Sequence, residues 1–471
     1  MNNIIRFLTG KGINTIDASF YTKISEWNSW YVSNVRGFSY YRVYSGNGTY
    51  TRRRRKSLGM AKTVSEDIAN LLLNERVKIT LSDEGTGEYV NSILDNNNFK
   101  TQGNEYQERK AATGTAAYVP YLYDMEISED GTILSGKIGI NYMSAEDIYP
   151  VSWDNGRVSE AVFTIRKTFK RRKYIHFQYH HIEGGQYVIE NMITAGGINE
   201  GHELTVSEWQ NLEPFKGLAS RIETGSLEPQ FVIDKLNKVN NADEDKSNPM
   251  GIALFANSID ILRSLDIKYD SYCNEFDLGR KRIFVAPEMI KNVDGSPTFD
   301  PDDSVFYQLP ENYDKSQTGL IKEVDMSLRT EDHSKAINDD LNYLSMKCGF
   351  GTERYRFERG QVKTATEVIS VNSDMFRTLQ KHEIILDDVI KEIVRIIIRL
   401  GIILGEPLNI DSEVTIDFDD SIIEDKNAER ESDRKDVAMG AMKLEEYRAK
   451  WYGETEEKAK TKIQEPAEVI E

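Results

Sequence analysis

Residues 330–348, TEDHSKAINDDLNYLSMKC, and residues 349–360, GFGTERYRFERG, decide the fold, because they stand directly before one very long helical stretch. The first segment is predicted to be a short amphipathic helix, with apolar residues spaced four, three and four apart: Ile337, Leu341, Leu344 and Cys348. The second segment has glycine at each end. Its central residues 352–359 hold three arginines, one tyrosine and one phenylalanine. The order therefore predicts a helix, a charged aromatic loop and a second helix.

The second helix is predicted to be unusually long. Thr364-Ala365-Thr366-Glu367 forms a capping box at its start. No glycine or proline follows before Gly401, so the helix reaches Leu400 and would be on the order of 55 Å long. One compact domain does not need a helix of that length. The sequence therefore predicts an element that spans a large assembly.

Composition and charge limit the class of protein. The length of 471 residues allows two to four domains or one elongated subunit, and 24 tyrosines fit a chain that buries surface against neighbours. The formal net charge is −18, and residues 405–471 alone hold 20 acidic against 10 basic side chains. An acidic surface argues against wrapping or storing nucleic acid by counterion release, which needs Lys and Arg. It is compatible with a channel through which DNA slides without stalling.

Several features bear on the compartment. Cys273 and Cys348 fall on apolar helix seams, and we expect buried free thiols in a reducing compartment. The first residues, MNNIIR, lack the apolar stretch and cleavage site of a signal peptide. The most apolar stretch, 393–404, is interrupted by Arg395 and Arg399, so we expect no transmembrane span.

The N-terminal half reads as an α+β unit. Helical periodicity comes first, and residues rich in Val, Ile, Tyr, Phe and Thr follow, with Gly184-Gly185 as a hairpin signal. A polar linker at 240–249 closes this unit. The predicted helices are 17–31, 58–74, 86–97 and 103–116, and the predicted strands are 117–127, 132–142, 158–169, 173–182 and 186–194.

The C-terminal half is predicted to be mostly helical. A helix over 252–278 carries a heptad-like seam that needs a partner, and the helix near Thr330 supplies one. Residues 279–325 read as short strands and turns. Gly401 and Gly405 end the long helix, 414–418 is a strand, and 421–464 is charged and helical. The seam residues of the first helix are Leu262, Leu265, Tyr269, Tyr272 and Phe276.

The sequence gives little support for catalysis or for metal binding. No phosphate-binding loop occurs, since Gly10-Lys11-Gly12 lacks the required glycine spacing, so we expect no ATP hydrolysis. On a strand, His176 and His180 share one face while His181 points the other way, which favours an ordinary sheet over a metal site. The acidic residues from 417 to 425 lack EF-hand spacing and favour a solvated face. We expect no catalytic residue, cofactor or metal.

Basic residues form three clusters, at 52–56, 170–173 and 280–282. For the first two, a turn or a solvated edge is the favoured interpretation, and the sequence does not assign them a role. The third cluster, Arg280, Lys281 and Arg282, follows the predicted helix 252–278 directly. From the sequence alone, a turn or a solvated edge is the favoured interpretation of this cluster as well.

The chain resembles the portal proteins of tailed bacteriophages, the head-to-tail connectors, of the siphophage type. The resemblance covers nearly the whole chain and depends on the order of segments more than on any one motif. Its residues are 325–328 (DMSL) with the following helix, the loop 349–362, 363–368 (KTATEV), 149–156 (YPVSWDNG), and 274–276 (NEF) running into 279–282 (GRKR).

The resemblance implies an α+β portal fold with a wing, stem helices, a clip, a long kinked helix and a helical crown, assembled as a ring. The implied divisions are a wing at 1–252, completed by 363–425, a stem helix at 253–278, a clip at 279–326, a second stem helix at 327–349, a tunnel loop at 350–362, the long wing helix at 363–403, a returning wing strand at 404–425, and a crown with the C-terminal tail at 426–471.

The resemblance also implies a non-enzymatic structural role in the virion, at one capsid vertex, after assembly in the cytoplasm of the bacterial host. About twelve copies would close into a cyclic ring that passes double-stranded DNA without sequence specificity during packaging and ejection. The implied partners are terminase, a head-completion or tail adaptor protein, and the major capsid and scaffold proteins, with no membrane. The residues expected to face DNA in the tunnel loop are Arg354, Tyr355, Arg356, Phe357, Glu358, Arg359, Gln361 and Lys363. The resemblance also places Arg280, Lys281 and Arg282 at the junction of stem helix and clip, where they are expected to face the channel or an acidic patch of an adjacent subunit.

Two alternatives stay open from the sequence. One is another phage structural or scaffold protein without a DNA channel. The other is a nucleic-acid enzyme, which a metal- or ATP-dependent activity of the purified protein would support.

Overall fold

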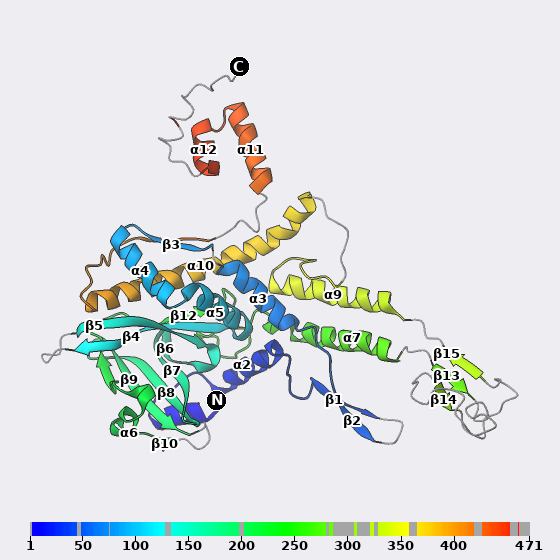
Figure 1. Cartoon of the computed structure of the whole chain (residues 1–471), viewed down its shortest axis with the longest axis horizontal. Helices are drawn as coiled ribbons and strands as arrows, with labels where there is room; N and C mark the ends of the chain where they lie inside the picture. The colour runs from blue at the N-terminus through cyan, green and yellow to red at the C-terminus, as the bar shows by residue number, and fades with distance from the viewer. Residues whose placement is uncertain are drawn as a thin grey trace, which may run out of the picture.

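The structure is a computed structural model, and it has an elongated helical rod on one side of a mixed helix-and-sheet body (Figure 1). This arrangement confirms the predicted α+β class. The residues that the structure describes are 2–44, 49–74, 76–127, 133–196, 202–278, 282–285, 306–308, 321–324, 328–357, 365–418, 426–452 and 460.

The helices of the body pack around one hydrophobic core. Asp17 caps α2 by accepting the N–H of Ser19 at 2.7 Å, and the buried side of this helix presents Phe20, Ile24 and Trp27 to the core. The helices are α1 (Asn2–Gly10), α2 (Ala18–Tyr31), α3 (Met60–Leu72), α4 (Glu84–Asn96) and α5 (Phe99–Thr113).

Two antiparallel sheets complete the body. One has the strand order β12-β4-β5, and the other has the order β10-β9-β8-β7-β6, with β11 also paired to β9. The middle of β7 (161–164) and of β8 (174–178) is buried without interruption, so both faces of these strands are covered there. The strands are β4 (Thr115–Ile127), β5 (Ile133–Ser144), β6 (Ile148–Asp154), β7 (Arg157–Phe169), β8 (Arg172–Glu183), β9 (Gln186–Ala195), β10 (His202–Glu203), β11 (Arg221–Glu223) and β12 (Val232–Lys235). The short helix α6 (Val206–Gln210) follows β10.

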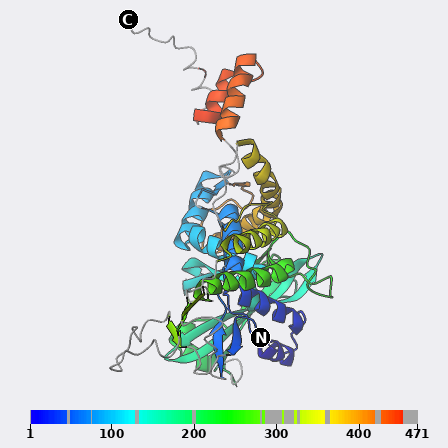
Figure 2. The same ribbon diagram turned by 90° about the vertical axis from the view of Figure 1, so that its right-hand side faces the viewer.

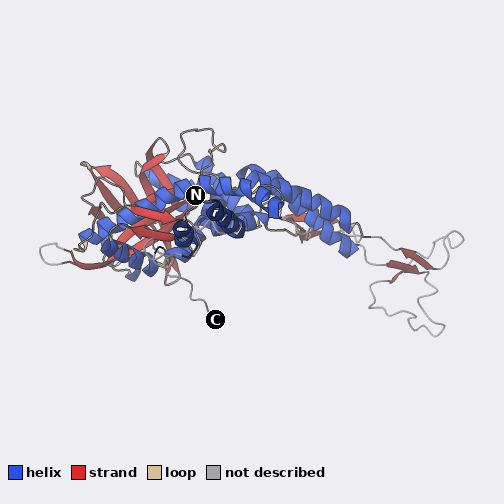
Figure 3. Ribbon diagram, turned by 90° about the horizontal axis from the view of Figure 1, so that it is seen from above, coloured by secondary structure: helices blue, strands red, loops and turns tan. Residues whose placement is uncertain are grey.

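The rod consists of α7 (Ile259–Leu278) and α9 (Thr330–Cys348), which lie side by side and antiparallel (Figure 3). Lys268 of α7 pairs with Asp340 at 2.7 Å, and Glu275 near the far end of α7 receives two hydrogen bonds from Arg329 at 3.0 and 2.9 Å. The predicted helical pairing is therefore confirmed. Beyond the end of the rod lie the three strands β13 (Arg282–Val285), β14 (Phe306–Gln308) and β15 (Ile321–Val324).

The long helix α10 (Ala365–Ile403) has 39 residues, which corresponds to about 58 Å. Its buried residues recur every three or four positions, from Met375 through Leu379 and Leu386 to Ile393, so one continuous stripe packs across the body. The predicted long helix is confirmed, while its capping box begins outside the described residues. After α10, β16 (Val414–Asp417) pairs antiparallel with β3 (Lys78–Leu81). The helices α11 (Lys426–Met439) and α12 (Leu444–Tyr452) lie apart from the body, beyond α10 (Figure 2).

The connection between body and rod is buried. Asn240, Asp243 and Asp245 form local turns with their own backbone, and residues 252–255 are then almost wholly inaccessible to solvent. At this point two backbones cross, because a Cβ on Gly251 would lie 2.3 Å from the carbonyl oxygen of Gly114. Only glycine permits this approach. The polar sequence 240–249 therefore forms an ordered junction that fixes the rod to the body.

Several predicted boundaries differ from the structure, and three of the differences have a clear physical reason. The first rod helix begins at Ile259 and not at 252, because residues 252–255 enter the core as irregular chain. The helix predicted over 103–116 ends at Thr113, since Gly114 adopts a left-handed φ of +96°. Gly401 lies inside α10, where a Cβ would come within 2.8 Å of the Tyr89 ring. That glycine is explained by close packing, and the helix ends two residues later.

The β1–β2 ribbon was not predicted. It consists of β1 (Tyr40–Tyr44) and β2 (Tyr50–Arg54), which pair antiparallel. The basic cluster at 52–56 thus begins within a strand. Its tyrosines and arginines hide the apolar alternation that usually indicates a strand.

Candidate functional site

The described part of the predicted tunnel loop, residues 349–357, folds back along α9. Gly349 ends α9 in a left-handed conformation with φ +89°, and the N–H of Phe350 reaches the carbonyl of Ser345 at 3.0 Å. Phe350 then enters the core. This helix end reverses the chain direction, which places the following residues beside α9.

Two asparagines one turn apart on α9 hold the returning chain. The side chain of Asn342 accepts the N–H of Glu353 at 3.0 Å, and that of Asn338 accepts the N–H of Phe357 at 2.8 Å. The i, i+4 spacing puts both amides on the same face of the helix. Phe357 then packs edge-on against Tyr272 of α7, with ring centroids 5.2 Å apart.

Arg354 and Tyr355 are attached to α3. Arg354 forms two hydrogen bonds to Asp67, at 2.9 and 2.7 Å, and the Tyr355 hydroxyl donates to the same carboxylate at 2.8 Å. The pair raises the pKa of Arg354, and burial next to Asp67 raises the pKa of Tyr355. Such bidentate pairing fixes the loop in one position.

The charges of the described loop are balanced. Arg356 pairs with Glu353 at 2.6 Å, and Arg354 pairs with Asp67. Both arginine side chains still expose 32% of their surface. Each guanidinium can therefore reach a phosphate, but only in competition with its own carboxylate partner, which makes such a contact weak.

The structure places the remaining predicted residues as follows. Glu358, Arg359, Gln361 and Lys363 lie outside the described residues, as do Arg280 and Lys281. Arg282 is the first residue of β13, where its backbone pairs with Val324. Sequence reasoning missed Asp67, Asn338 and Asn342, which hold the loop. Asp67 lies 287 residues before Arg354, so no local signal indicated this contact.

The three clustered histidines do not meet as metal ligands. His176 bonds to Asn191 at 2.7 Å, and His180 lies fully buried between the rings of Phe163 and Phe231. His181 points to the opposite side of β8, as strand alternation predicted.

Among the described residues one group could hold a metal ion: His181, Glu183 and Glu190. Arg221 pairs with Glu183 at 2.7 Å and with Glu190 at 3.0 Å, so a cation already occupies this position. We therefore do not interpret the group as a metal centre.

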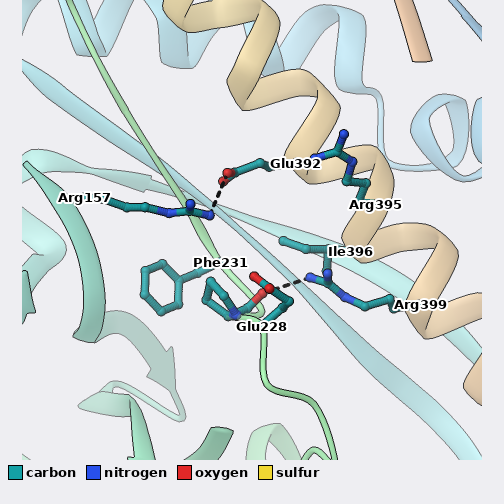
Figure 4. Close-up of a pocket in the computed structure, with 8 residues that line it drawn as sticks. Arg157, Glu228, Phe231, Glu392, Arg395, Ile396 and Arg399 are labelled. Atoms are coloured by element: carbon teal, nitrogen blue, oxygen red, sulfur yellow. Dashed lines mark hydrogen bonds and ion pairs between the residues drawn. The ribbon is translucent and has the colours of Figure 1, made fainter. Parts of the chain in front are cut away.

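A groove of about 350 Å³ lies where α10 crosses the start of β7 (Figure 4). Arg157 pairs with Glu392 at 3.0 Å, and Arg399 donates to the carbonyl of Pro229 at 3.1 Å. Burial lowers the pKa of Arg399. Glu228 and Glu392 balance most of the positive charge of the three arginines that line the groove. The ion pair and the hydrogen bond attach α10 to the neighbouring segments, and we do not interpret the groove as a catalytic site.

The sequence was also compared with known proteins. The family model described as phage portal protein, SPP1 Gp6-like, matches residues 11–470. The chain belongs to the phage portal protein family. The resemblance noted in the sequence is thereby confirmed, and portal proteins are structural phage proteins and not enzymes. No curated protein matches the chain in a sequence search. In the part of this portal protein that the structure describes, no helix is long and apolar enough to cross a membrane.

The buried histidines predict how this portal protein responds to acid. Burial lowers the pKa of His176 to about 4, and that of His180 and His382 to about 3, from 6.5. At these three histidines the unfolded chain therefore binds more protons than the folded chain between about pH 6.5 and about pH 4, and Asp147, whose pKa burial raises to about 6, offsets only part of this difference. Stability should fall as the pH is lowered through this window. Urea unfolding midpoints between pH 7 and pH 4 would measure the effect.

Variants at two histidines would show whether a buried histidine causes this acid sensitivity. Among the described residues neither ring nitrogen of His180 has a hydrogen-bond partner, so His180→Leu should stabilise the protein by about 1 kcal/mol and flatten the pH profile. His202 is exposed, and His202→Gln should leave the profile unchanged. If His180→Leu kept the full pH dependence, buried His180 would not contribute to it.

Proposed function

We propose that about twelve copies of this chain close into a cyclic ring at one capsid vertex, with a central channel for double-stranded DNA. The ring would serve DNA packaging and ejection, dock terminase during filling, and later carry the tail adaptor. The observation that carries this proposal is the family match over residues 11–470. In this proposal the protein belongs to the virion, assembles in the host cytoplasm, and contacts the major capsid and scaffold proteins.

The rod supports our assignment of segments to the wing, stem, clip and crown of the ring subunit. The buried junction at Gly251 fixes α7 and α9 to the body, so each subunit has a rigid shape that repeated packing can use. We assign the body and α10 to the wing, α7 and α9 to the stem, residues 279–326 to the clip, and α11 with α12 to the crown.

The loop at 350–362 is proposed to border the channel. Its described arginines are each paired with a carboxylate, which suits brief contacts with the DNA backbone that are indifferent to base sequence. Arg280, Lys281 and Arg282 are proposed to face the channel or a neighbouring subunit near the clip. The acidic charge of the chain, −18, also disfavours tight binding of DNA.

Electron microscopy of the purified chain tests the proposal directly. We expect single rings with a central hole and cyclic symmetry in negative stain, and light scattering should give the mass of about twelve subunits. A chain that stays monomeric at high concentration would contradict the ring. A different assembly without a hole would favour a structural phage protein that has no DNA channel.

A further inference from the structure

The β1–β2 ribbon extends from the body next to α7 (Figure 1). In its register, Tyr40 faces Arg54, Arg42 faces Arg52 and Tyr44 faces Tyr50. Directly opposed residues of an antiparallel pair project on the same side. We call these six residues the outer face. A two-stranded ribbon is marginally stable by itself, so contacts on its faces decide whether it holds its shape.

The inner face is attached to the protein's own stem helix. The Tyr41 hydroxyl donates to Asp270 of α7 at 2.8 Å, and Arg53 pairs with Asp277 at 3.4 Å. Arg55, just after β2, lies over the Tyr41 ring at 4.8 Å. These contacts hold the ribbon in a fixed position and turn its other face outward.

The outer face carries three tyrosines and three arginines, all exposed. Tyr44 and Tyr50 expose 64% and 69% of their surface, and their rings pack edge to face at 5.2 Å. Arg52 lies over the Tyr40 ring at 4.1 Å. In the part of the chain that the structure describes, Arg42 and Arg54 have no carboxylate partner. The face is thus preorganised, aromatic and positively charged.

A hollow of about 520 Å³ adjoins the outer face at the base of the ribbon. Arg36, Arg42 and Arg52 line it together with Tyr40. A side chain from another molecule can therefore insert beside the exposed rings. Tyrosine and arginine in such a setting are the residue types that dominate binding energy at protein interfaces.

We propose that the outer face of the β1–β2 ribbon docks on an acidic surface of a neighbouring copy of this chain. The inference rests on the proposed ring. Copies that each carry a formal charge of −18 repel one another unless basic surfaces meet acidic ones. The outer face concentrates three positive charges on a chain with a large acidic excess, and a head-to-tail ring interface joins two different surfaces of neighbouring copies. The charge complement of the face is therefore the chain itself.

Nucleic acid is the competing partner for a surface of tyrosine and arginine. Two of the three tyrosines pack edge to face on each other and the third packs under Arg52, so these rings are already held by contacts within the protein. A protein surface that lies over the packed rings keeps them. The net charge of −18 repels nucleic acid from the chain as a whole, so we favour a second copy over nucleic acid.

Charge reversal tests the inference. Arg42→Glu combined with Arg54→Glu should raise at least tenfold the concentration at which rings dissociate, measured by light scattering on dilution. The matched control is Arg171→Glu with Arg172→Glu, which makes the same charge change where β7 turns into β8 and should leave assembly unchanged. Equal ring stability for the outer-face variant and the wild type would overturn the inference and leave the proposed ring intact. A wild type that forms no ring would refute the proposed function first.

A photo-crosslinking residue at position 50 gives a result that does not depend on the folding of the charge-reversal variant. Tyr50 is 69% exposed, so the replacement should be tolerated. Irradiation of assembled protein with added duplex DNA should give covalent dimers of the chain. Crosslinks to DNA in place of dimers, or no dimers from intact rings, would overturn the inference.

Discussion

Asp234→Ala is expected to lower the free energy of unfolding by about 3–5 kcal/mol, because it leaves the charge of Lys110 buried without a partner. Lys110 of α5 and Asp234 of β12 pair at 2.9 Å with 1% and 0% of their side-chain surfaces exposed. Gln107 donates to the same carboxylate at 2.7 Å and to the Tyr118 hydroxyl at 2.9 Å. No solvent reaches this network to stabilise a lone ammonium group.

The network connects elements that are far apart in sequence. It joins α5, β12 and β4, and the charge of Lys110 also contributes to the lowered pKa of His382 on α10, after the larger effect of burial. Loss of Asp234 should therefore loosen the packing of α10 on the sheet β12-β4-β5. Urea unfolding at one fixed protein concentration would measure the change, since assembly also affects apparent stability.

Two further variants test whether the unpaired charge of Lys110 causes the loss of stability. Glu105→Ala removes an exposed partner of Arg109 on the same helix and should change stability by less than about 0.5 kcal/mol. Lys110→Met with Asp234→Leu removes both buried charges and should recover most of the loss. If Asp234→Ala were as mild as Glu105→Ala, the buried pair would not hold these elements together.

Periodic patterns explain what the sequence could predict. The seam of α7 and the spacing of Ile337, Leu341 and Leu344 identified the two rod helices, and the absence of glycine and proline identified α10. These signals are local, because a helix buries one face whatever its partner is. Helix ends were less accurate, since Gly401 serves packing against Tyr89 and does not end the helix.

The rest depended on contacts between distant residues. The anchoring of the loop needs Asp67 on α3, and the junction needs the crossing of Gly114 and Gly251. In the sequence, Asp67 and these two glycines look like any other aspartate or glycine of the chain. The β1–β2 ribbon was missed for a related reason, because its inner face is held by carboxylates of α7 and not by a hydrophobic core.

Arg354→Glu combined with Arg356→Glu is expected to reduce packaged DNA by about tenfold or more, while rings still form. Each subunit would exchange two positive charges for two negative ones, and the ring repeats this change around the channel. Negative charge repels the phosphates that the loop is proposed to touch. Packaging efficiency with purified rings, together with ring counts by electron microscopy, would measure the effect.

The anchoring of the loop complicates that experiment, because Arg354→Glu also opposes Asp67. A charge swap, Asp67→Arg with Arg354→Asp, resolves this. It retains an ion pair between α3 and the loop but moves the positive charge from the loop to the helix. The control Arg171→Glu with Arg172→Glu tests whether any loss of basic charge has the same result.

The outcome of the swap decides between two roles for Arg354. If Arg354 acts through its positive charge in the loop, the swapped protein should package less DNA than the wild type, and more than the double reversal because Arg356 keeps its charge. If Arg354 serves only to hold the loop against α3, the swap should restore packaging. We expect the first result. In the pair with Asp67, 32% of the Arg354 side chain stays exposed, so the guanidinium can exchange Asp67 for a phosphate of the DNA. Full packaging by the swapped protein would contradict a role for Arg354 at the channel surface. It would show that Arg354 only attaches the loop to α3 of the wing.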